Sequence, residues 1–91
     1  MSLLEVGEIN KFVEIHGWSR KEDSIIKEFT LSDFSSALAF TVRIGIEAEK
    51  ADHHPDIYLF SWNKVKIVLS THSEGGITEK DISLAKVIEK L

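Results

Sequence analysis

The chain has 91 residues and a formal net charge of −4 at pH 7, and it contains no cysteine. A chain of this length builds only one hydrophobic core, so we expect a single domain over residues 1–91, which pairing with further copies would stabilise. The negative charge and the absence of a Lys or Arg run argue against direct nucleic acid binding, and the lack of cysteine excludes disulfides and thiolate metal sites.

Apolar residues at helical spacing predict a first amphipathic helix from Leu3 to Ile15, and Gly17 is a typical residue for its C-terminal stop. The polar segment 19–24 then leads into an apolar stretch from Ile25 to Leu31. We expect these two segments to form a hairpin that turns near Glu22-Asp23.

A long helix is predicted from about Asp33 to about Lys50, with Ser32 as its N-cap. Large apolar residues lie all round this helix, so we expect it to be covered on more than one side. One face carries Phe34, Leu38, Thr41, Gly45 and Ala48, and other faces carry Phe40, Val42, Ile44 and Ile46.

A second hairpin is predicted after the loop 51–55, with residues 57–60 and 65–69 as its arms and a turn near Trp62-Asn63. Gly75-Gly76 ends this pattern, and Thr78 is the predicted N-cap of a last helix. The order helix, two strands, helix, two strands, helix lacks the alternation typical of parallel sheets. It predicts an α+β fold, in which three helices pack on one face of a four-stranded antiparallel sheet.

The sequence carries no targeting or membrane-spanning signal. Its first residues lack the basic start and apolar run of a signal peptide, and no apolar stretch approaches the roughly 20 residues that span a bilayer. We therefore expect the protein to be cytoplasmic.

Three of the four histidines lie at the two ends of the second hairpin, His53 and His54 before it and His72 after it. Because the ends of an antiparallel hairpin meet, we expect these three side chains to lie close together. Imidazole titrates near neutral pH, so such a cluster is typical of proton-transfer chemistry. The flanking segments add three carboxylates: Glu49, Asp52 and Asp81.

Simpler interpretations exist for several of these residues. A lone loop histidine is usually solvated, which is our expectation for His16. Asp81 follows Thr78 by three residues, so a capping box explains it structurally. Three histidines and a carboxylate would also make an acceptable zinc set, but the adjacent side chains of His53 and His54 tend to diverge, and we expect no metal.

Longer motifs resemble a known family. Residues 49–55 (Glu-Lys-Ala-Asp-His-His-Pro), 62–65 (Trp-Asn-Lys-Val), 69–72 (Leu-Ser-Thr-His) and 75–78 (Gly-Gly-Ile-Thr) closely resemble pterin-4a-carbinolamine dehydratases, as do Gly17-Trp18 and residues 31–34. The resemblance implies an enzyme without a cofactor that dehydrates 4a-hydroxytetrahydropterin to quinonoid dihydropterin, which recycles tetrahydrobiopterin for aromatic amino acid hydroxylases. It also implies a homodimer or homotetramer of α+β subunits.

The resemblance further implies which residues form the site. The active-site histidines of the family fall on His53, His54 and His72, and the supporting carboxylates on Glu49 and Asp81. The remaining substrate-binding positions fall on Asp52, Ser70, Thr71 and Ser73.

One departure concerns residues 56–62, a segment one residue longer than in many members of the family. The extra residue predicts either a β-bulge or a longer hairpin turn.

The leading hypothesis is dehydration by histidine acid–base catalysis. Loss of water needs a proton delivered to the 4a-hydroxyl and one removed from the adjacent ring nitrogen, and imidazoles suit both tasks. We assign the proton transfers to His54 and His72, and to His53 the positioning of the pterin with a share in the acid role. The alternatives are a pterin-binding or protein-dimerisation module without turnover, and a pterin carrier.

Overall fold

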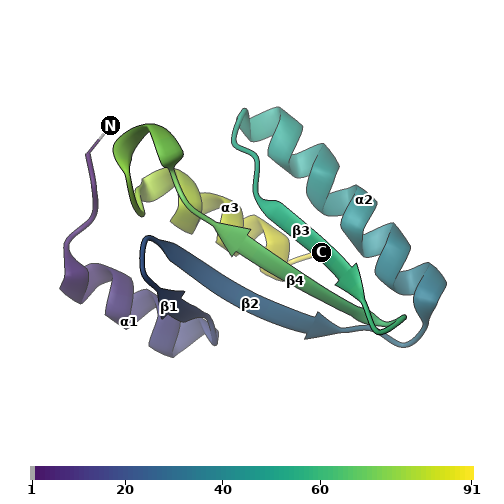
Figure 1. Ribbon diagram of the computed structural model, residues 1–91. Coiled ribbons are helices and arrows are strands. Elements are labelled where there is room, and N and C mark those ends of the chain that lie inside the picture. The colour runs from purple at the N-terminus through teal and green to yellow at the C-terminus, as the bar shows by residue number, and fades with distance from the viewer. Residues whose placement is uncertain (1) are drawn as a thin grey trace.

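The computed structural model describes residues 2–91, and Figure 1 shows one sheet with helices behind it. All strand pairs are antiparallel, and the strand order is β1-β2-β4-β3. The expected α+β fold is therefore confirmed. In chain order the elements are α1 (Val6–His16), β1 (Ser19–Lys21), β2 (Ser24–Thr30), α2 (Phe34–Ala51), β3 (Asp56–Phe60), β4 (Lys64–Leu69), the 3-10 helix η1 (His72–Glu74) and α3 (Glu79–Glu89).

The two faces of the sheet differ in chemistry because side chains alternate along each strand. In β4, Val65, Ile67 and Leu69 are fully buried and pack in the hydrophobic core, while the intervening residues are only half-buried. On the opposite face the amine of Lys66 lies 4.9 Å from the ring centroid of Tyr58. One fully buried apolar face and one partly exposed face of mixed character are typical of an antiparallel sheet covered on one side.

Helix α2 differs from the sequence-based prediction in its cap and in its buried face. Its N-cap is Asp33 rather than Ser32, because Asp33 Oδ1 accepts a hydrogen bond from Ser36 N at 2.7 Å. Of the apolar faces named from the sequence, the one that begins with Phe34 and Leu38 does not face the core, since these two residues are 52% and 48% exposed. The residues that face the core are Ala37, Phe40, Ile44 and Ala48.

The physical reason is that α2 is apolar nearly all round, so its periodicity does not select a face. Tertiary contacts select it: the Phe40 ring packs edge-on against Phe29 of β2, with centroids 5.0 Å apart. The expected coverage on more than one side is not found within residues 2–91, where Val42 and Ile46 are 56% and 52% exposed.

Helix α1 begins at Val6 rather than at Leu3, because the preceding residues are extended. Leu4 N donates a hydrogen bond to Ile77 O at 2.9 Å, which ties the N-terminal segment to the loop before α3. None of the helices within residues 2–91 is both long enough and apolar enough to cross a membrane.

The extra residue of the second hairpin lies in its turn. The β3–β4 register runs without interruption from the pair Asp56 and Val68 to the pair Phe60 and Lys64, so there is no bulge. The turn 61–63 instead uses two left-handed residues, with φ of 46° at Ser61 and 55° at Trp62. The extra residue therefore lengthens the turn and does not interrupt the strand pairing.

Candidate active site

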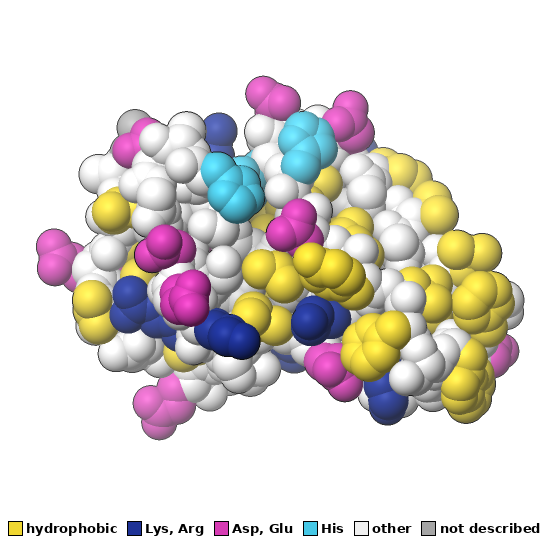
Figure 2. Space-filling view, viewed as in Figure 1, with side chains coloured by type: hydrophobic (Ala, Val, Ile, Leu, Met, Phe, Trp, Pro, Cys, Tyr) yellow, Lys and Arg dark blue, Asp and Glu magenta, His cyan; other side chains and the backbone are white. Residues whose placement is uncertain are grey.

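The ends of α2 and β4, the helix η1 and the start of α3 meet at one end of the molecule, where Figure 2 shows histidine side chains flanking a notch. A hollow of about 250 Å³ lies there. The structure thus brings together all three predicted histidines and four predicted substrate-binding residues, with one lysine besides. The hollow is lined by Asp52, His53, His54, Ser70, Thr71, His72, Ser73 and Lys80.

The end of α2 separates the two adjacent histidines. Asp52 caps the helix in the left-handed conformation, with φ of 50°, which Asp tolerates better than most residues. His53 N still donates to Ala48 O at 3.1 Å, so the chain turns within one residue. His53 consequently points inward and is 8% exposed, while the side chain of His54 is 59% exposed.

His53 is held by a buried carboxylate. Its Nε2 lies 2.6 Å from Asp81 Oδ1, and Asp81 is fully buried. The other carboxylate oxygen, Oδ2, accepts hydrogen bonds from Thr71 Oγ1 at 2.8 Å and from Thr78 N at 2.9 Å. With Asp81 accepting throughout, Nε2 of His53 is the donor, and Nδ1 is the ring nitrogen left for proton exchange.

Asp81 therefore has two structural roles rather than one. Its bond to Thr78 N completes a capping box at the start of α3, as the sequence predicts. The same carboxylate orients His53, which lies 28 positions earlier in the chain. Buried side chains within residues 2–91 leave no polar atom without a partner, so this network is fully satisfied.

His54 and Glu49 form a second, exposed pair. His54 Nε2 lies 2.6 Å from Glu49 Oε1, and the two side chains are 59% and 79% exposed. An ion pair this open to water adds little stability. Glu49 thus reaches the hollow only through His54.

The loop that carries His72 is closed by backbone and side-chain bonds. Thr71 N donates to Gly76 O at 2.7 Å, and Gly75 ends η1 in the left-handed conformation, with φ of 72°. Ser70 Oγ donates to Asp23 O at 2.7 Å, so its hydroxyl anchors the β1–β2 turn to the site. The backbone of residues 70–73 is thereby fixed along one wall of the hollow.

His16 corrects an expectation, because it is not a solvated loop residue. Its Nδ1 lies 3.0 Å from Glu89 Oε1, and its ring stacks on Phe12 with centroids 4.3 Å apart. Glu89 also accepts a hydrogen bond from Trp18 Nε1 at 2.7 Å. The partner is 73 positions away in sequence, so no local pattern indicates it.

Sequence reasoning missed Lys80, which lines the hollow from the first turn of α3. The only available signal was its place beside Asp81, itself a candidate site residue. No group of three His, Asp or Glu side chains within residues 2–91 is arranged to hold a metal ion.

Two relatives of similar length carry the same name. It is 46% identical over 81 residues to a protein of Thermosynechococcus vestitus, covering 89% of this chain and 84% of that one. It is 44% identical over 91 residues to a protein of Roseiflexus castenholzii, covering 99% and 97%. Both are named pterin-4-alpha-carbinolamine dehydratase, with the activity marked as provisional.

Solved structures agree on the fold. A Brucella melitensis protein described as a transcriptional coactivator/pterin dehydratase superposes with a TM-score of 0.90 at 35% identity, covering 98% of this chain and 97% of that one. A pterin dehydratase-like protein, described as a RuBisCO assembly factor in the alpha-carboxysome, shares the fold at a TM-score of 0.66 and 20% identity, covering 80% and 83%.

The sequence profile of one family, pterin 4 alpha carbinolamine dehydratase, matches residues 2–91. This match extends over the helices, the sheet and every residue of the histidine hollow. The chain therefore belongs to the pterin 4 alpha carbinolamine dehydratase family, a family of hydro-lyases.

Proposed function

We propose that the protein dehydrates 4a-hydroxytetrahydropterin to quinonoid dihydropterin by histidine acid–base catalysis, within the recycling of tetrahydrobiopterin. The observation that carries this proposal is the His53–Asp81 pair, whose ring borders a hollow that His54 and His72 also line. Three imidazoles around one small polar hollow provide both a proton donor and a proton acceptor.

The reaction needs two proton transfers. A protonated imidazole gives its proton to the 4a-hydroxyl, and the C4a–O bond breaks to release water. A neutral imidazole removes the proton from N5, whose electron pair then forms the C4a=N5 double bond of the quinonoid product. Because the added and the lost proton balance, the histidines together end the cycle as they began it.

The contact with Asp81 supports a larger part for His53 in proton transfer than the sequence alone suggests. Asp81 fixes its ring orientation and holds Nε2, so that Nδ1 exchanges the proton. His54 and His72 keep their proposed part in proton transfer, and Glu49 orients His54. The flat pterin ring would lie along the polar wall formed by Asp52, Ser70, Thr71 and Ser73.

The direct test is stopped-flow measurement of 4a-hydroxytetrahydropterin decay with and without the protein. The decay also proceeds unaided in water, so the expected result is an acceleration proportional to protein concentration. A rate equal to the buffer background, from folded protein, would refute the proposed function and leave the family and the fold unaffected.

The proposed mechanism uses neither a metal nor an organic cofactor. Prolonged chelation should leave the catalysed rate unchanged. A loss of turnover that zinc restores would instead assign the histidines to metal binding.

We further propose that the protein is a cytoplasmic homo-oligomer, joined through the exposed face of α2. Apolar side chains gather over α2 and the β3–β4 turn (Figure 2). Two antiparallel copies of α2 would pack the same apolar face of each copy against the other, which favours a second copy as the partner. The face consists of Phe34, Leu38, Val42 and Ile46, each about half exposed.

Light scattering tests this assembly. We expect a mass of two or four times 10.3 kDa, and dissociation of the variant Leu38→Glu. A stable wild-type monomer at micromolar concentration would contradict it.

The same face supports the second candidate function, a dimerisation module without turnover. The Brucella melitensis relative is described both as a coactivator and as a dehydratase, so the two roles occur together in one description. An oligomer that does not accelerate the dehydration would favour this alternative. Direct nucleic acid binding is not part of either proposal.

A further inference from the structure

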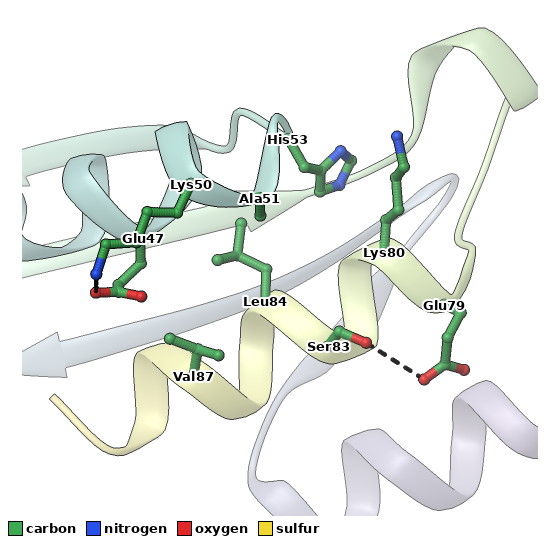
Figure 3. A pocket seen from close by; sticks show the side chains of 9 residues that line it. All are labelled: Glu47, Lys50, Ala51, His53, Glu79, Lys80, Ser83, Leu84 and Val87. Carbon is green, nitrogen blue, oxygen red and sulfur yellow. Dashed lines mark hydrogen bonds and ion pairs between the residues drawn. The ribbon is translucent and has the colours of Figure 1, made fainter.

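A second hollow, of about 390 Å³, lies between α2 and α3 beside the histidine hollow. His53 and Lys80 line both hollows, so the two share a boundary. Figure 3 shows these two residues at one end of the groove, with Leu84 and Val87 of α3 pointing toward α2. The other residues of the groove are Glu47, Lys50, Ala51, Glu79 and Ser83.

The sizes of the two hollows indicate that they act together. Sites for small ligands typically enclose about 300–1,000 Å³. The histidine hollow, at about 250 Å³, lies below that range, which suits a flat bicyclic ring without its substituent. The groove adds the volume that a substituted pterin needs.

The connectivity of the pterin ring gives the direction of that substituent. The reacting atoms are C4a and N5, and C6 is bonded directly to N5. A substituent on C6 therefore begins one bond from the nitrogen that exchanges its proton with a histidine. With N5 facing His53, the chain leaves the histidine hollow past His53 and Lys80, where the groove begins.

The lining of the groove indicates the chemistry of the substituent. Ala51, Leu84 and Val87 provide apolar contact for a carbon chain. Polar groups surround this floor, and Ser83 Oγ lies 3.5 Å from Glu79 Oε1. Two lysines and two glutamates line the groove, so their charges cancel, and a neutral hydroxylated chain fits better than a phosphorylated one.

We propose that the α2–α3 groove binds the C6 substituent of the pterin, a short neutral hydroxyalkyl chain, and so determines which pterins are preferred. The inference rests on the proposed dehydratase function. Lys80 stands at the junction of the two hollows and ion-pairs with no carboxylate of residues 2–91, which leaves its ammonium free to donate to a chain hydroxyl.

The experiment compares kcat/KM for two substrates, the 4a-hydroxytetrahydropterins with a methyl group and with a 1,2-dihydroxypropyl group at C6. Wild type should prefer the dihydroxypropyl substrate. Val87→Phe fills the groove and should lower the ratio of dihydroxypropyl to methyl kcat/KM by about 10-fold or more. Val6→Phe makes the same change on α1, where Val6 is 54% exposed, and should keep the wild-type ratio.

Two further variants keep the proposal testable if Val87→Phe does not fold. Ser83→Leu fills the groove from an exposed position and should lower the ratio in the same direction. Lys80→Met keeps the stem and removes the ammonium, and should raise KM for the dihydroxypropyl substrate more than for the methyl substrate. If the folded groove variants dehydrate both substrates with the wild-type ratio of kcat/KM, the proposed role of the groove is wrong and the proposed dehydratase function is unaffected. Absence of turnover with both substrates in wild type overturns the function itself.

A phosphorylated substituent tests the charge argument. Replacing the terminal hydroxyl of the chain by a phosphate should lower kcat/KM relative to the neutral chain. A higher kcat/KM with the phosphate would contradict the assignment to a neutral chain.

Discussion

Two histidine–carboxylate pairs lie in different parts of this protein and have different surroundings. His53 Nε2 is 2.6 Å from Asp81, and the two side chains are 9% and 0% exposed. His16 Nδ1 is 3.0 Å from Glu89, with exposures of 32% and 21%. The His53 ring borders two hollows, whereas the His16 ring is stacked on Phe12 and its carboxylate is shared with an indole.

The difference teaches that a histidine beside a carboxylate does not by itself make a catalytic site. At His53 one ring nitrogen is held by Asp81, and the ring lines a hollow that two more imidazoles also line. At His16 the pair joins α1 to the end of α3 and satisfies the indole N–H of Trp18. The first pair should therefore control turnover and the second should control stability.

The largest expected effect is the loss of catalysis in His53→Ala. Turnover should fall by about 10² to 10⁴-fold, the usual contribution of a positioned acid–base group. The background reaction in water sets a floor, so the measured loss lies toward the lower end. Stopped-flow decay of 4a-hydroxytetrahydropterin above background measures it.

His54→Ala and His72→Ala belong to the same series and should also lose turnover. His16→Ala is the matched comparison and should keep the wild-type rate per folded molecule. Full activity in both His54→Ala and His72→Ala would show that the assignment of these two histidines is wrong, whatever His53→Ala does.

A smaller loss is expected for Asp81→Asn, which keeps the side-chain shape. The amide of Asn has one oxygen where the carboxylate has two, and its NH₂ group cannot accept a hydrogen bond. Either His53 Nε2 or Thr78 N of the capping box therefore loses its acceptor. Turnover should fall by about 10²-fold or less, because the imidazole itself remains. Conservative Asp81→Glu serves as a partial rescue, and equal rates for wild type and Asp81→Asn would remove Asp81 from the mechanism.

The His16 region should respond in stability alone. Glu89→Ala leaves the indole N–H of Trp18, a residue only 4% exposed, without its acceptor. An unsatisfied buried donor costs about 1–3 kcal/mol, which urea unfolding can resolve. Glu14→Ala, an exposed position on α1, is the control. A loss of kcat in folded Glu89→Ala would erase the distinction between the two regions.

The sequence predicted the features that depend on local pattern. Turn and cap residues lie where the sequence places them. These are the hairpin turns at Glu22-Asp23 and Trp62-Asn63, the N-cap Thr78 of α3 and the C-cap Gly17 of α1. The meeting of His53 with His72 also followed, because it needs only an antiparallel hairpin.

Features decided by distant contacts were beyond this reasoning. The buried face of α2 depends on Phe29, and the partner of His16 is at the other end of the chain. Of the two roles of Asp81, the sequence predicts the capping box, which is local. It does not predict the hydrogen bond to His53, which lies 28 positions away. The place of Lys80 beside Asp81 did not indicate its role, because that role depends on the two hollows that it lines.

The smallest expected effect concerns Asp33, a carboxylate outside both regions that serves as a baseline for them. Hydrogen bonds from the side chain and backbone of Ser36 and from the side chain of Ser35 lower the pKa of Asp33 below its ordinary value of 3.8. A lowered pKa in the folded state means that ionised Asp33 stabilises the fold above pH 3.8 and that this contribution is lost as the pH falls through the lowered value.

Asp33→Asn isolates that contribution, because Asn caps a helix about as well as Asp but does not titrate. All other ionisable groups are the same in both proteins, so their contributions cancel in the comparison. The melting temperature of wild type minus that of Asp33→Asn should therefore decrease slightly as the pH falls from 5 to below 3.8. Asp23→Asn is the control, because the side chain of Asp23 makes no hydrogen bond within residues 2–91. The melting temperature of wild type minus that of Asp23→Asn should show no such trend. A wild-type minus Asp33→Asn difference that stays constant over this range would show that the charge of Asp33 contributes nothing, and that its hydrogen bond to Ser36 N acts in the same way whether or not the carboxyl is ionised.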